Sequence, residues 1–274
     1  MFPIKGWVSR STLIDVLMYV LNKFSRGVIF LSGNYLIVLI VTQIGHLVGF
    51  KIPDASPADL GAGSAIAVVL IMVLAWDFGD YLGHLALHKI PVLWEIHKVH
   101  HSATFLSPAT GFRTHPLEIY TRNIFPSAVA SVALFSICYI EKINPLDILG
   151  AMWVVYGLIS IVILQQLQHS HIPIGFGYLD YVFISPHMHQ LHHSEKPEHW
   201  DKNIATLFSL WDWMFGTAVR EKAASPVTTG LGNGAPKDAE YLSLYGAYIR
   251  PVVNAVQLVV GKWTAYDPTP APEA

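Results

Sequence analysis

Histidines recur in three closely spaced sets, and this spacing is the strongest chemical signal in the sequence. The sets are His84 and His88, then His97, His100 and His101, and finally His189, His192 and His193. Spacings of three and four residues bring side chains to one face of a helix. Because imidazole is the commonest metal ligand near neutral pH, the pattern predicts a polyhistidine metal centre.

The number of histidines favours two metal ions over one. His169, at the end of a hydrophobic segment, adds a ninth imidazole to the three sets. A structural zinc takes four ligands and a catalytic zinc takes three. Two ions of higher coordination number could share all nine side chains and keep positions open, so we expect a di-metal site.

Carboxylates should surround such a site, because imidazoles are neutral and leave the metal charge uncompensated. Ligating histidines usually donate the other ring N–H to a carboxylate or carbonyl oxygen. Glu95 and Glu118 are candidates for this role. The residues that we expect to fill it are Asp77, Asp80, Asp201 and Asp212.

The composition is that of an integral membrane protein. Of the 274 residues, 53% are hydrophobic and 13% are charged, and the mean hydropathy is +0.43. Soluble domains have about 25% charged residues. The net charge of -2 gives no indication of a nucleic-acid partner. A single cysteine, Cys138, excludes an internal disulfide and a thiolate-rich metal site.

Four hydrophobic segments lie near residues 28–48, 62–80, 120–140 and 146–167. Each is close to the ~20 residues that a helix needs to cross a bilayer. We therefore expect an all-α integral membrane fold of about four transmembrane helices, with a helical cap that holds the histidines. Residues 1–27 would be an N-terminal amphipathic segment on the membrane surface, and 28–220 the membrane-embedded domain. Residues 221–274 would be a loop, an amphipathic helix and a disordered tail.

The distribution of Lys and Arg predicts the orientation. Of seventeen such residues, only Lys51 and Lys142 fall on the side opposite the termini. Positive charge concentrates on the cytoplasmic side of membrane proteins, so both termini should be cytoplasmic. The histidine sets should share that side, because two membrane segments separate the second set from the third.

Several motifs occur in a recognisable order over residues 70–220: H-L-A-L-H, H-K-V-H-H, G-F-R-T-H-P-L-E, Q-H-S-H-I, P-H-M-H-Q-L-H-H and W-D-W-M-F-G-T. This order resembles the fatty acid hydroxylase / sterol desaturase superfamily of membrane-bound non-haem di-iron oxygenases. The resemblance implies that the nine histidines bind two iron ions and that O2 is a co-substrate. It also implies hydroxylation or desaturation of a membrane lipid, such as a sterol or a fatty acyl chain.

The same resemblance leaves a tenth ligand open. The family often has one about a turn before His169, where this chain has Gln165 or Gln166. His115, His171 and His199 are the other candidates. The loop G-F-R-T-H-P-L-E also offers Arg113 and His115 as substrate contacts, with Arg113 suited to an anionic head group.

The reaction needs two electrons from outside. The sequence contains no H-P-G-G haem motif and no thiolate set, so a separate reductase with a ferredoxin or cytochrome is implied. An ether-lipid or carotenoid monooxygenase is an alternative in the same class. A membrane metal-binding or metal-transport protein is an alternative of another class, but a transporter would hold its ligands near the middle of the bilayer.

Overall fold

The computed structural model describes residues 4–50, 60–223, 227–232 and 239–261, and these residues form helices without a β-strand. The α-helices are α1 (Ile4–Trp7), α2 (Arg10–Leu47), α3 (Ala62–Lys89), α4 (Pro91–His101), α5 (Pro116–Glu141), α6 (Pro145–Val162), α7 (Pro186–His192), α8 (Leu210–Phe215), α10 (Leu244–Tyr248) and α11 (Arg250–Val259). Short 3-10 helices include η2 (Thr110–Phe112), η3 (Gln165–Leu167), η4 (Gly177–Tyr181) and η5 (Pro197–His199). The expected all-α class is confirmed.

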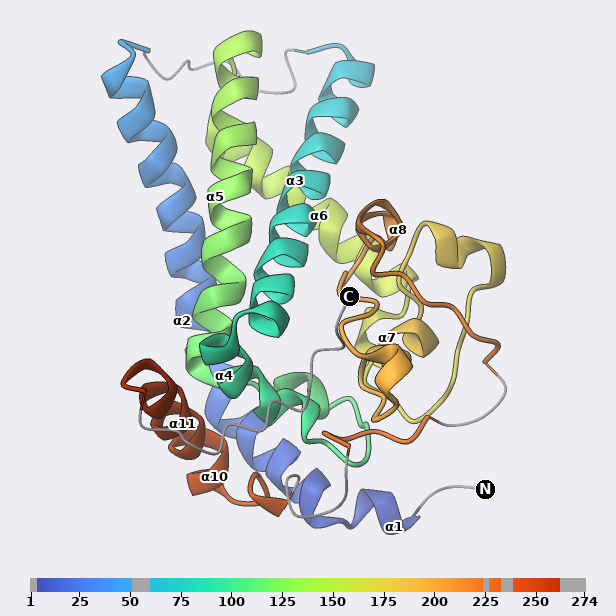
Figure 1. Cartoon of the computed structure of the whole chain (residues 1–274). Helices are drawn as coiled ribbons and strands as arrows, with labels where there is room; N and C mark the ends of the chain where they lie inside the picture. Colours follow the sequence, from blue (N-terminus) through green and yellow to red (C-terminus); the bar gives the residue numbers. More distant parts are fainter. Residues whose placement is uncertain (1–3, 51–59, 224–226, 233–238, 262–274) are drawn as a thin grey trace.

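Three helices, α3, α5 and α6, are long and apolar enough to cross a membrane. They contain three of the four hydrophobic segments. The first segment forms the C-terminal half of α2. Among the described residues of this half, the apolar stretch Tyr35–Leu47 is too short to cross a membrane by itself. Figure 1 shows this half of α2 running beside α5. Three of the four expected spans therefore have candidate helices, and the fourth stays a prediction.

The membrane-length helices share one hydrophobic core. Buried residues of α3, α5 and α6, among them Met72, Leu134 and Met152, pack together with Ile37 of α2. The helices α3 and α5 approach each other closely at Gly79. A Cβ atom on Gly79 would lie only 2.3 Å from the Cα of Pro126.

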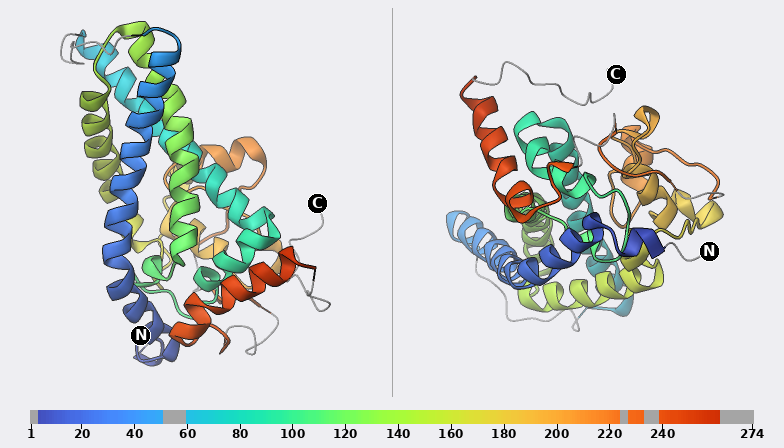
Figure 2. Two further views of the ribbon diagram at one scale, coloured as in Figure 1. Left: turned by 90° about the vertical axis from the view of Figure 1, so that its left-hand side faces the viewer. Right: turned by 90° about the horizontal axis from the view of Figure 1, so that it is seen from below.

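A helical cap lies at one end of this bundle. Figures 1 and 2 show α4, α7, α10, α11 and the start of α2 at this end, opposite the end of α2, the start of α3 and the α5–α6 connection. Ile14 and Met18 of α2 are buried there against Val99 of α4 and Tyr241. The described part of the predicted N-terminal amphipathic segment forms α1 and the first half of α2, which runs unbroken past residue 27 and buries part of its apolar row in the cap. The placement of this segment on the membrane surface stays a prediction.

Proline stands at the start of three helices around the histidine cluster. Pro91, Pro116 and Pro186 stand in the first turns of α4, α5 and α7, where their missing N–H costs no hydrogen bond. Ser185 caps α7 by accepting a hydrogen bond from the N–H of Met188. Pro251 likewise separates α10 from α11, as expected for the C-terminal amphipathic helix. The predicted disordered tail lies outside the described residues.

Candidate metal centre

All nine predicted ligands lie in two adjacent groups of histidines. The first group is His84, His88, His97, His101 and His192, and the second group is His100, His169, His189 and His193. Within each group, one ring nitrogen per residue lies within 4.8 Å of all the others. The groups touch, since the ring centroids of His101 and His193 are 4.6 Å apart. Residues far apart in sequence thus meet as the spacing predicted.

Protein oxygens fix the tautomer of several rings. A carbonyl oxygen can only accept, so an Nδ1 atom that contacts one must carry the proton, and a carboxylate favours the same tautomer. In both groups Nε2 is then left with a lone pair. The contacts from Nδ1 are His84 to Ile204 O (2.6 Å), His88 to Asp201 Oδ1 (3.1 Å), His97 to Glu118 Oε1 (3.0 Å), His100 to Arg113 O (3.3 Å) and His192 to Lys202 O (2.8 Å).

These Nε2 lone pairs point at one another. The Nε2 atoms of His84 and His97 are 3.1 Å apart; His84 holds its proton on Nδ1, and a carboxylate oxygen lies 3.0 Å from Nδ1 of His97. In the second group, Nε2 of His169 lies 3.1 Å from that of His100 and 3.0 Å from that of His189. Two facing lone pairs repel unless a cation lies between them. The arrangement therefore fits bound metal.

Burial keeps the imidazoles neutral. Loss of solvent lowers the pKa of the rings outside the membrane-length helices well below the usual value, and mutual repulsion among the histidines lowers it further. The affected residues are His97, His100, His101, His169, His189, His192 and His193. A neutral, nitrogen-only ligand set suits iron, zinc, copper or nickel.

Two carboxylates contact ligand rings directly. Asp201 accepts from Nδ1 of His88 and also from Lys89. Glu118 in the first turn of α5 lies against Nδ1 of His97, with both side chains fully buried. Glu118 was a candidate that the sequence did not single out. Its place in the T-H-P-L-E motif, beside the histidines, was the available signal.

The other expected carboxylates act elsewhere. Asp77 accepts hydrogen bonds from Trp211 Nε1 and the N–H of Phe208, so it anchors the segment before and within α8. Asp80 pairs with Arg122. Asp212 accepts from the N–H groups of Ile204 and Ala205. None of these three carboxylates therefore forms the expected hydrogen bond to a ligand ring among the described residues. Asp212 acts indirectly, because it holds the segment in which the carbonyl oxygen of Ile204 accepts a hydrogen bond from Nδ1 of His84.

The expected substrate contacts, Arg113 and His115, are both buried within the cap. Arg113 is fully buried, and its guanidinium contacts Asp15, Ser11 and Ser102 in the interior of the cap. His115 caps α5 by accepting from the N–H of Leu117, and its Nε2 lies 2.9 Å from the carbonyl oxygen of Tyr248. Both residues hold the loop before α5 in place.

No candidate for a tenth histidine ligand joins either group. His115 caps α5, His199 contacts Glu221 Oε1 at 3.0 Å, and the ring of His171 packs against those of Trp7 and Phe105. The second group therefore has one histidine fewer than the first among the described residues.

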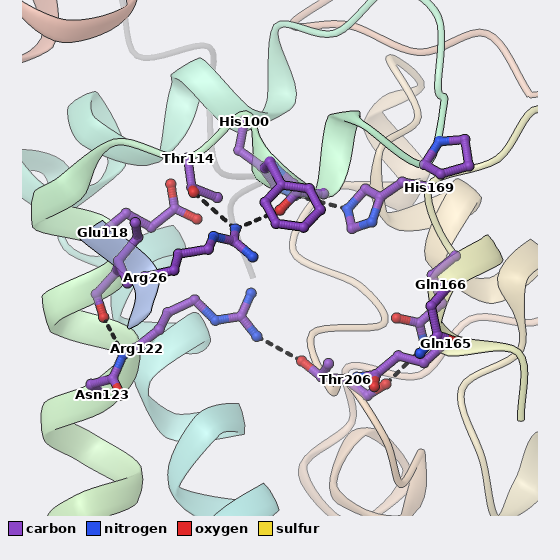
Figure 3. A pocket seen from close by; sticks show the side chains of 15 residues that line it. Arg26, His100, Thr114, Glu118, Arg122, Asn123, Gln165, Gln166, His169 and Thr206 are labelled. Atoms are coloured by element: carbon purple, nitrogen blue, oxygen red, sulfur yellow. Dashed lines mark hydrogen bonds between the residues drawn. The ribbon is translucent and has the colours of Figure 1, made fainter. Parts of the chain in front are cut away.

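A cavity of about 560 Å³ borders the second group at His100 and His169. Its walls come from α2, the loop around η2, α5 and η3 (Figure 3). Arg26, Glu118 and Arg122 bring charge to it, and Gln165 and Gln166 line the side near η3. We call this cavity the Arg26 pocket. It is the space beside the histidines in which a substrate could lie.

Comparison with known proteins agrees with this geometry. The fatty acid hydroxylase family model matches residues 69–217, which include all nine grouped histidines. The chain belongs to the fatty acid hydroxylase family. No solved structure matches it.

Lipid-oxidising enzymes are among the curated relatives of this fatty acid hydroxylase family member. Alkylglycerol monooxygenase of Caenorhabditis elegans is 26% identical over 79% of this chain and 45% of its own length. The human alkylglycerol monooxygenase is 27% identical over 64% of this chain and 36% of its own length. Ornithine lipid hydroxylase OlsE of Rhizobium tropici is 31% identical over 61% and 46%. The matches cover less than half of these relatives.

Proposed function

We propose that the protein is a membrane-bound non-haem di-iron oxygenase that hydroxylates or desaturates a lipid with O2. The observation that carries this is the pair of histidine groups with inward lone pairs, next to a pocket and at the end of membrane-length helices. The names of the relatives add that members of this family oxidise alkylglycerols and ornithine lipids. An ether-lipid substrate is the alternative that the alkylglycerol monooxygenases favour.

Bound iron would supply the activation of O2 and the oxidation of a C–H bond. The chain's own part is to hold and shield that chemistry. The histidines supply neutral donors, and Asp201 and Glu118 balance charge while they orient His88 and His97. The second group, with four histidines and a neighbouring pocket, is the side on which a substrate would meet the metals. Electrons would come from an external reductase with a ferredoxin or cytochrome.

The membrane orientation is part of the proposal. The cap that carries the histidines would lie on the cytoplasmic side together with both termini, as the distribution of Lys and Arg indicates. A lipid substrate would then reach the Arg26 pocket sideways from the bilayer, because its alkyl chain gains nothing by leaving hydrocarbon.

Two neighbouring histidines of α7 provide the test. His189 belongs to the second group, whereas His187 is equally buried and belongs to neither. The variant His189→Ala should lose iron and O2-dependent lipid oxidation, and His187→Ala should keep both. Iron content of the purified protein and mass spectrometry of cellular lipids are the measurements. A wild-type lipid profile in cells with His189→Ala would refute the assignment, and metal flux into vesicles without lipid oxidation would favour a transporter.

A further inference from the structure

The wall of the Arg26 pocket is largely apolar, with polar side chains set into it. Those with amide or hydroxyl groups are Thr114, Asn123, Gln165, Gln166, Gln168 and Thr206. Several of these groups are already hydrogen-bonded within the protein: Gln168 donates to the carbonyl of Thr206, and the hydroxyl of Thr206 donates to Asp80. A polar group of a substrate would therefore pair with the donors left over in the pocket, and Arg26 supplies them.

Arg26 brings to this pocket a positive charge with no carboxylate at ion-pair distance among the described residues, although Glu118 lies in the same wall. Its Nη2 donates to the carbonyl of Gly111 (2.5 Å) and to Oγ1 of Thr114 (2.9 Å), which are both uncharged. Its Nε is buried without a hydrogen-bond partner in the described part of the chain. The ring of Phe112 supports the guanidinium at 4.5 Å. Since a guanidinium has five N–H donors, several remain for a ligand.

Arg122 lies beside Arg26 and differs from it in this respect. Its Nε and Nη2 contact the two carboxylate oxygens of Asp80 at 3.0 and 2.5 Å, and Nη2 also reaches Thr206. That pair is neutral overall. Figure 3 shows both guanidinium groups extending into the pocket from α2 and α5. Arg26 is therefore the arginine of the pocket that forms no ion pair among the described residues, while Glu118 in the same wall lies against His97.

We infer that Arg26 binds an anionic oxygen group, a carboxylate or a phosphate, at the polar end of the substrate lipid. A guanidinium matches the geometry of both anions. This inference rests on the proposed function, because it assigns the pocket to the substrate. His100 and His169 border the same pocket. The oxidised carbon therefore lies within a few bonds of the polar group and not far along the alkyl chain.

Binding without turnover tests the anion site. The full-length protein, loaded with redox-inert zinc in phosphatidylcholine nanodiscs, is titrated with dodecanoate, dodecyl phosphate and the neutral 1-O-dodecylglycerol, with empty nanodiscs as the background. We expect at least one of the two anions to bind about tenfold more tightly than the neutral lipid. The stronger of the two identifies the head group as carboxylate or phosphate.

Variants of α2 assign the effect to one residue. Arg26→Gln should lose the preference for the anion, and Lys23→Gln should keep it, because Lys23 is an exposed basic residue of the same helix. Zinc content reports whether each variant is intact. If Arg26→Gln loses zinc, Arg26→Lys replaces it in the test. That variant keeps the charge without the planar fork, so it should bind the anion several-fold more weakly than wild type and still prefer it.

Equal affinity for the neutral and anionic lipids, or an unchanged preference in an intact Arg26→Gln, would overturn the inference. Turnover by the iron-loaded enzyme separates this inference from the proposed function. Lipid products oxidised next to the head group support the inference, and products oxidised in mid-chain overturn the claim that the oxidised carbon lies close to the polar group. Anion binding that depends on Arg26, with no oxidation of any lipid, would leave the anion site standing and count against the oxygenase.

Discussion

Asp15 and Arg113 form an ion pair of 3.0 Å in which both side chains are fully buried, and it joins α2 to the loop before α5. Both partners lie in the cap, and the carbonyl oxygen of Arg113 accepts a hydrogen bond from Nδ1 of His100. The pair therefore links the N-terminal helix to a ligand of the second histidine group.

Removing the carboxylate should be strongly destabilising. Asp15→Ala leaves a buried guanidinium without its counter-charge, and we expect a loss of about 3–5 kcal/mol in the free energy of unfolding. Chemical denaturation in detergent measures it. The pair of Glu240 and Arg250 is the control, because its partners are 43% and 48% exposed. Glu240→Ala should cost less than about 1 kcal/mol. Similar losses in the two variants would contradict the role given to Asp15.

The contact between His88 and Asp201 should tune metal affinity in the first group. Asp201→Asn removes a negative charge and weakens the hold on Nδ1 of His88, so metal should bind about 10- to 100-fold more weakly. Competition with a chelator measures this change. Glu198→Gln removes an exposed charge from the same loop and should leave the affinity unchanged. An Asp201→Asn protein with wild-type affinity would show that the contact is not used.

Two glycines of α3 should respond to alanine in opposite ways. A Cβ atom on Gly79 meets the backbone of Pro126, so Gly79→Ala must push α3 and α5 apart. Overpacking of this kind costs about 1–3 kcal/mol. Gly63 has open space around it, and Gly63→Ala should stabilise the helix by about 0.5–1 kcal/mol. Thermal unfolding of both variants checks the signs, and a stabilised Gly79→Ala would place the helix crossing elsewhere.

Asp212 should make stability depend on pH. Burial raises its pKa from 3.8 to about 6, against the lowering effect of its hydrogen bonds from Thr217 and the backbone. The folded protein then takes up a proton near pH 6 that the unfolded chain binds only near pH 3.8, so this residue stabilises the fold increasingly as pH falls through 6. From pH 7 to pH 5 the gain is about 1.4 kcal/mol.

The matched comparison uses Asp212→Asn, which does not titrate. The free energy of unfolding of the wild type minus that of Asp212→Asn should increase as pH is lowered from 7 to 5. Parallel pH profiles for the two proteins would refute the raised pKa.

The sequence was informative where the geometry is local. His97, His100 and His101 share a face of α4 because helical spacing dictates it, and the membrane-length helices follow from apolar runs. It was uninformative where a polar residue chooses among distant partners. Arg113 looked accessible in a loop, but its partner Asp15 lies 98 positions away. Asp77 and Asp80 lie about two turns and one turn before His84 on the same helix. Their oxygens nevertheless accept hydrogen bonds from Trp211 and Arg122 and not from ligand rings. Those choices depend on packing that spacing does not encode.

The single helix α2 limits how the cap can move. Its 38 residues, at 1.5 Å each, extend about 57 Å, more than the ~40–45 Å of a whole bilayer. If α2 is the fourth predicted span, one end projects beyond the bilayer, and that end carries Asp15 and Asn22, which are buried in the cap. Because α2 is continuous from the cap into the bundle, the cap could not move away from the bundle as a rigid body without bending this helix. The proposed lipid substrate would then be admitted by movements of side chains and short loops around the pocket.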